Sequence, residues 1–113
     1  MSSQERLNSL LKTEIAKIVN QEIIIPGVLL TILRVSSDDR GSFLKVELSV
    51  LPSTKAGTAL NSLRKNSKSI AKKLQTKTRL KRIPKLDWNL DLYNSSDYEL
   101  DKIFKQIEDE KNE

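Results

Sequence analysis

The stretch at residues 60–86 reads LNSLRKNSKSIAKKLQTKTRLKRIPKL, and it determines both the expected fold and the expected surface charge. Its large apolar residues, Leu60, Leu63, Ile70 and Leu74, recur at spacings near three, four and seven, as on one face of an amphipathic helix. The other positions hold ten basic residues and no acidic residue. These basic residues are Arg64, Lys65, Lys68, Lys72, Lys73, Lys77, Arg79, Lys81, Arg82 and Lys85. The stretch therefore predicts helical structure with one side in the core and a cationic outer side.

The middle of this stretch predicts a kink between two helical halves. Asn66, Ser67 and Lys68 stand there, and Ser67 takes a place where the apolar stripe calls for a large apolar residue. Asn and Ser are also poor helix formers. A kinked pair of helices with lysines on its outer side would present hydrogen-bond donors to phosphates.

The charge of the chain is strongly segregated along the sequence. Residues 52–86, which add Lys55 to the ten above, hold 11 of the 20 basic residues and none of the 15 acidic residues. The rest of the chain contains 9 basic and all 15 acidic residues and therefore has a net charge of −6, although the whole chain carries +5. A solvated helix face that serves solubility is the simpler explanation, but the complete absence of acids favours a polyanionic partner.

Length and composition exclude most catalytic and metal sites. With 113 residues, 37% of them hydrophobic, we expect a single domain over residues 1–113, a core over about residues 4–108 and a disordered tail at 109–113. The chain has no Cys and no His, so it lacks disulfides, thiolate metal sites and the commonest metal ligand and general base. We therefore expect no enzymatic activity, no cofactor and no metal.

Neither end of the chain suggests export or membrane insertion. The first residues, MSSQER, lack the pattern of a secretory signal. No apolar run approaches the ~20 residues that a membrane-spanning helix needs. A cytoplasmic monomer that does not bind membranes is expected.

The patterning elsewhere predicts an α+β fold. We expect a helix at residues 4–21, an antiparallel hairpin of strands at 28–35 and 42–51, and then the kinked helices, capped at their start by Ser53 or Thr54. A third strand is predicted by the alternation of Leu86, Trp88, Leu90 and Leu92 with polar residues. The spacing of apolar residues over 100–107 predicts a final amphipathic helix. The order is helix, strand, strand, helix, kink, helix, strand, helix, with a three-stranded sheet packed on helices.

Residues 79–88, RLKRIPKLDW, carry the most specific resemblance to a known family. A basic-aliphatic-basic run, then Pro, an apolar residue and an aromatic residue, with Asp91 following, resembles the ribosome-binding factor A family. The resemblance spans roughly residues 6–107. It implies a K-homology-like domain of the second topology and a non-catalytic assembly factor that binds the small ribosomal subunit during late maturation and processing of its ribosomal RNA. Small-subunit ribosomal proteins are further candidate partners, and the ten basic residues are the expected RNA contacts.

The chain departs from the family pattern at two motifs. It reads Ile25-Pro26-Gly27 where the family usually has Asp-Pro-Arg, and Asn66-Ser67-Lys68 where the family commonly has Ala-x-Gly at the kink. Gly permits backbone angles and close approach that Lys does not. Lys68 would instead place a cation at the corner between the helices.

Two other classes of function remain open from the residues alone. The first is a protein-interaction module whose hairpin edge or first helix meets an acidic partner. The more remote one is a metal-dependent nuclease, for which the only paired carboxylates are Asp38 with Asp39 in a turn, Asp87 with Asp91 on a strand, and those of the acidic C-terminal tail. Base stacking is not expected, because the chain is poor in aromatic residues. Trp88 and Phe104 are expected in the core, whereas Phe43 could pack or make contacts.

Overall fold

The computed structural model describes residues 3–91, and its elements follow the predicted order over that range. They are α1 (Ser3–Glu22), β1 (Leu29–Ser37), β2 (Phe43–Leu51), the short 3-10 helix η1 (Ser53–Lys55), α2 (Ala56–Lys65), α3 (Ser67–Thr78) and β3 (Lys85–Leu90). The predicted final helix and acidic tail lie outside the described residues. Between residues 3 and 91, no helix has both the length and the apolar character needed to cross a membrane.

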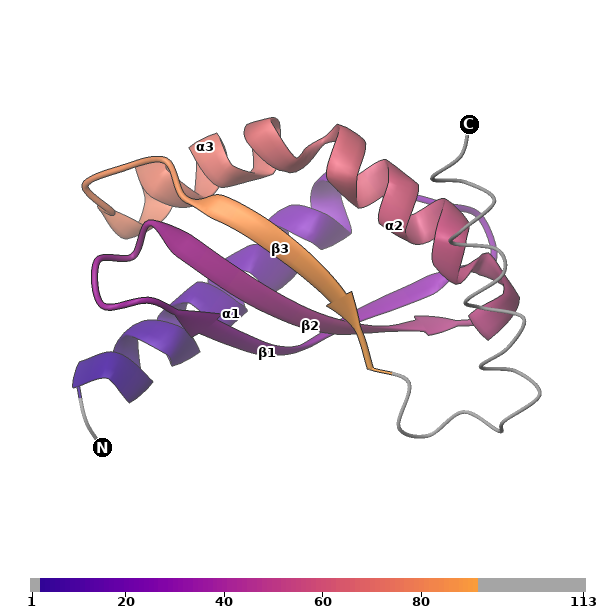
Figure 1. The fold of residues 1–113 in the computed structure, drawn as a ribbon. Helices are drawn as coiled ribbons and strands as arrows, with labels where there is room; N and C mark the ends of the chain where they lie inside the picture. Colours follow the sequence, from indigo (N-terminus) through magenta and orange to yellow (C-terminus); the bar gives the residue numbers. More distant parts are fainter. Residues whose placement is uncertain (1–2, 92–113) are drawn as a thin grey trace.

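Within residues 3–91 the strands form one mixed sheet in the order β1-β2-β3. β1 and β2 make the predicted antiparallel hairpin, whereas β2 and β3 run parallel. Parallel neighbours need a crossover connection, and α2 and α3 provide it as one bent ridge along the upper edge of the molecule (Figure 1). The basic stretch is therefore the crossover itself.

The core fills the space between one face of the sheet and the helices. The inward residues of β2 are all buried: Leu44, Val46, Leu48 and Val50. Their partners on β3 are Leu86, Trp88 and Leu90, in register with Leu44, Val46 and Leu48. α1 adds a stripe of fully buried side chains to this core: Leu11, Ile15, Ile18 and Val19. Trp88 is only 5% exposed, which confirms its predicted place in the core.

A β-bulge explains why the sequence of β1 shows little regular alternation. The register with β2 shifts between Ile32 and Arg34, so that Leu33 is the extra residue. As a result Ile32 and Val35, three positions apart, both face the core opposite Leu48 and Val46.

Three details of the segment from η1 to β3 differ from expectation or extend past the described residues. Neither Ser53 nor Thr54 caps α2 with its side chain, because these residues form η1, whose first backbone bond runs from the Lys55 N–H to the Pro52 carbonyl. α3 ends at Thr78, since Arg79 takes the left-handed conformation with φ 59°, so residues 79–84 form a loop rather than more helix. β3 ends at Leu90, and Leu92, which the alternation also assigned to this strand, lies outside the described residues.

Two segments, the β1–β2 turn and the loop between α3 and β3, meet at the same end of the molecule, on the left of Figure 1. The N–H of Lys85 donates to the carbonyl of Ser42 over 2.9 Å. Gly41 is buried with φ +66°, and a Cβ added there would lie 3.2 Å from Cδ2 of Leu80. Close packing at Gly41 therefore joins the turn to the loop.

This contact predicts that Gly41→Ala destabilises the protein more than Gly27→Ala. Gly27 also has a positive φ, +74°, but a Cβ there would have nothing within 4 Å. Gly27→Ala should cost about 1 kcal/mol from backbone strain alone. Gly41→Ala should cost more, because Leu80 must also shift. Urea unfolding monitored by Trp88 fluorescence measures both variants, and equal losses would show that the Leu80 contact is without effect.

Candidate nucleic-acid interface

All ten basic residues predicted as RNA contacts lie exposed on the surface. Arg64 and Lys65 end α2, while Lys68, Lys72, Lys73 and Lys77 belong to α3. Arg79, Lys81 and Arg82 stand in the following loop, and Lys85 begins β3. The ten residues thus belong to successive elements of the crossover between β2 and β3, including its end at Lys85. Their role as RNA contacts remains a prediction.

The predicted kink is confirmed at Asn66, which separates α2 from α3. Its backbone angles, φ −102° and ψ 8°, lie outside the helical region, although its N–H still donates to the Ser62 carbonyl over 3.1 Å. The Asn66 side-chain amide donates to the same carbonyl at 2.8 Å. An Asn with ordinary negative φ therefore makes the corner without glycine.

Ser67 attaches this corner to the sheet. Its hydroxyl donates to the carbonyl of Leu63 over 2.9 Å, and it accepts a hydrogen bond of 2.6 Å from Nε1 of Trp88 on β3. Indole has a single N–H, and buried donors without a partner are costly. The small polar residue that interrupts the apolar stripe is thus the partner of the buried Trp.

We predict that Ser67→Ala lowers the free energy of unfolding by about 1–3 kcal/mol, because it leaves the indole N–H of Trp88 buried without an acceptor. The matched control is Ser69→Ala on the exposed side of α3, which should change stability by no more than about 0.5 kcal/mol. Urea unfolding gives both values. Indistinguishable variants would show that this hydrogen bond does not hold the corner.

The lysines of α3 differ in whether they form an ion pair within the protein. Lys73 forms an ion pair with Glu22 at the end of α1, so part of its charge is neutralised within the protein. The stems of Lys72, Lys73 and Lys77 line a shallow depression with Thr76. Lys68 and Lys72 have no ion pair within residues 3–91. Lys77 also has no ion pair there, and Lys68 and Lys72 are the unpaired lysines of α3 that lie nearer to the corner in the sequence.

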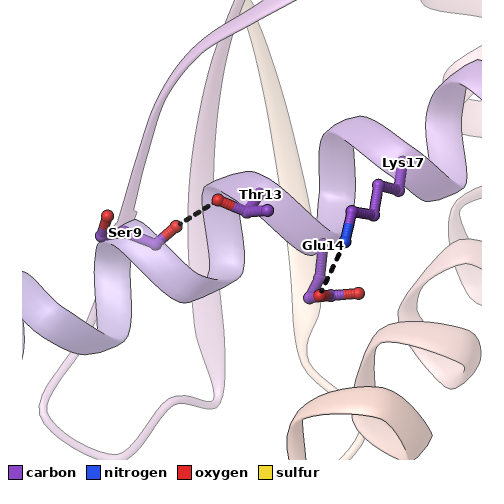
Figure 2. Close-up of polar contacts among 4 residues, drawn as sticks. All are labelled: Ser9, Thr13, Glu14 and Lys17. Atoms are coloured by element: carbon purple, nitrogen blue, oxygen red, sulfur yellow. Dashed lines mark hydrogen bonds and ion pairs between the residues drawn. The ribbon is translucent and has the colours of Figure 1, made fainter.

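The polar face of α1 has a different character. It mixes acidic and basic residues, and Figure 2 shows Lys17 paired with Glu14 at 3.7 Å and the Thr13 hydroxyl donating to the Ser9 carbonyl. Charge on this face is balanced locally. The polar face of α1 therefore differs from the acid-free crossover, and it supplies matched control positions such as Lys12, which is exposed.

The carboxylates considered for a metal site do not form one in the part of the chain that the structure describes. No group of three or more His, Cys, Asp or Glu residues within residues 3–91 could hold a metal ion. Asp38 instead shapes the β1–β2 turn, since its Oδ1 accepts from the N–H of Ser42 at 2.8 Å and its Oδ2 accepts from the Ser42 hydroxyl at 2.7 Å. Asp87 is exposed in register with Lys45.

The side-chain hydrogen bond from Ser42 lowers the pKa of Asp38 below its ordinary value of 3.8, and backbone N–H groups of the turn act in the same direction. Since the folded-state pKa is the lower one, Asp38 stabilises the turn above its ordinary pKa. That stabilisation is lost as the pH falls through the folded-state pKa.

We predict that the amide signal of Ser42, followed by NMR, titrates with a midpoint below pH 3.8, because that amide donates to the carboxylate. Asp38→Asn should abolish the transition. A midpoint at or above 3.8 would contradict the hydrogen-bonded turn.

Arg40 is a cation of this end of the molecule that the sequence reasoning missed. It stands in the β1–β2 turn, well before the basic stretch, yet it lines the same pocket as Arg79, Lys81 and Arg82. Only a long-range contact brings them together. The sequence places Arg40 in a turn between two paired strands, which indicates that it is exposed. Nothing in the sequence indicates which loop lies beside that turn.

Comparison with known proteins identifies relatives of the chain. A family profile described as ribosome-binding factor A matches residues 3–104. The crystal structure of ribosome-binding factor A from Thermus thermophilus is similar, with a TM-score of 0.68 and 25% identity over 77% of this chain and 94% of that one. A homology model of the Thermus thermophilus factor, fitted into a cryo-EM map of its complex with 30S, matches with a TM-score of 0.67 and 24% identity over 80% of this chain and 97% of that one. A comparison with curated proteins finds no match. The likeness confirms the predicted α+β, K-homology-like fold.

Proposed function

Because the chain belongs to the ribosome-binding factor A family, we propose that it binds the small ribosomal subunit and assists the late maturation and processing of that subunit's ribosomal RNA. It would act without catalysing a reaction, as one RNA-binding domain over residues 1–113, in the cytoplasm where subunits are assembled. The observation that carries the proposal is the exposed, acid-free crossover between β2 and β3.

The proposed mechanism is electrostatic docking of the α2–α3 ridge and the loop after it onto ribosomal RNA. Lys and Arg side chains that neutralise phosphates release condensed counterions, so binding should weaken steeply as salt rises. Such contacts carry no base sequence information. Selectivity for the small subunit would therefore come from the shape of the folded RNA and from neighbouring ribosomal proteins.

The rigid corner between the helices supports this mechanism. Asn66 and Ser67 fix the bend through three hydrogen bonds, and Lys68 begins the exposed side of α3 directly after it. Cations held at a fixed angle match one RNA geometry better than others. Rearrangement of the RNA during maturation would remove that match and release the factor.

We predict that Lys68→Glu and Lys72→Glu each weaken binding to purified small subunits by about tenfold or more, because each replaces a phosphate contact with repulsion. The slope of log affinity against log salt should fall by about 1 for each phosphate contact that is removed. Lys12→Glu on α1 makes the same change in net charge and should have little effect. Co-sedimentation over a range of salt concentrations measures all three.

Two outcomes would contradict the proposal. Equal weakening by Lys12→Glu and Lys72→Glu would mean that the crossover is not the docking face. Binding to ribosomal particles that resists both salt and nuclease would favour the protein-interaction alternative instead.

A further inference from the structure

The end of the molecule that joins the β1–β2 turn to the α3–β3 loop contains a pocket of about 430 Å³. Its volume falls within the range of small-ligand sites. Leu7 of α1 and Leu80 of the loop line it, and both also pack against the hydrophobic core. The pocket lies beyond the end of α3, so it is distinct from the ridge of α2 and α3.

The charges around this pocket are unbalanced. Four cationic residues line it, Arg40 from the turn and Arg79, Lys81 and Arg82 from the loop, whereas Asp39 is the one acidic residue that lines it within residues 3–91. Within residues 3–91 none of the four takes part in an ion pair. Guanidinium groups match the geometry of phosphate oxygens and bind them through paired hydrogen bonds.

Hydrogen bonds and close packing join the two backbone segments that carry these cations. The Asp38 carboxylate holds the turn through its bonds to Ser42, and Gly41 packs against Leu80. Arg79 takes the left-handed conformation that commonly ends a helix, with φ 59°, and its N–H donates to the Gln75 carbonyl over 3.0 Å. These contacts therefore hold the two segments that carry the four cations close together.

We propose that this pocket is a discrete phosphate subsite of the RNA interface, in which Arg40 joins Arg79, Lys81 and Arg82 to bind one backbone phosphate. This inference rests on the proposed function, which supplies RNA as the ligand. It extends the interface past the crossover to a residue 39 positions before Arg79 in the chain. The subsite also gives the ridge a second anchoring point, so that the protein would dock in one orientation along the RNA.

The first test uses a short single-stranded RNA, six uridines long, followed by NMR with the full chain. The amide signals of Gly41 and Leu80 should shift on its addition, because both residues line the pocket. Arg40→Gln should reduce those shifts, while Arg34→Gln should leave them unchanged. Arg34 is an exposed arginine within β1 and provides the control for the loss of one charge.

The second test measures the binding of the same two variants to small subunits over a range of salt concentrations. Arg40→Gln should weaken binding about tenfold, the loss expected for one charge-assisted phosphate contact, and lower the salt slope by about 1. Arg34→Gln should do neither. Urea unfolding of both variants ensures that folded proteins are compared.

The outcomes separate this inference from the proposed function. If the wild-type chain binds subunits but Arg40→Gln and Arg34→Gln behave alike in both tests, the subsite is disproved and the function stands. If the wild-type chain fails to bind subunits while the oligonucleotide still shifts the Gly41 and Leu80 signals in an Arg40-dependent way, the subsite stands and the function is disproved.

Discussion

The parallel pairing of β2 with β3 is the constraint on which the rest of the structure depends. After β2 the chain must travel back along the sheet before β3 can begin beside it, and it does so through α2 and α3. That return path needs one apolar stripe for the sheet and α1, and it leaves the opposite side to solvent. Because every charged residue on the path is basic, the charge that the crossover exposes to solvent is entirely positive.

The ridge is held in shape by a polar contact in an otherwise apolar core. Within residues 3–91 no polar or charged residue is buried, and the indole N–H of Trp88 reaches the half-buried Ser67 at the bend. Trp88 also pairs in register with Val46 in the centre of the sheet. The bend between α2 and α3 is thereby coupled to β3, the strand that carries the end of the sequence RLKRIPKLDW.

Local patterns in the sequence were sufficient to predict the elements and their order over the described range. Residues that recur at strand or helix spacing are buried in the structure. They are Leu44, Val46, Leu48 and Val50 on β2, and Leu60, Leu63, Ile70 and Leu74 on α2 and α3. The sequence could not predict the left-handed residue that ends α3, because Arg79 has no glycine-like signature. Nor could it place Arg40 beside Arg79, because that proximity follows from tertiary packing of Gly41 on Leu80 and not from any periodicity. The sequence shows Ser67 only as a polar residue that interrupts the apolar stripe of the two helices. Its hydrogen bond with Trp88 could not be predicted, because Trp88 lies 21 residues further along the chain.

The bulge at Leu33 bears on how the molecule behaves towards copies of itself. Over residues 3–91 β1 is an outer strand of the sheet, and an outer strand with regular, flat pairing offers its free backbone groups as a template for strands from other molecules. A bulge bends such a strand and increases its local twist. The irregularity that brings Ile32 and Val35 to the same face of the sheet thus also makes the β1 edge less suited to the addition of a strand from another molecule.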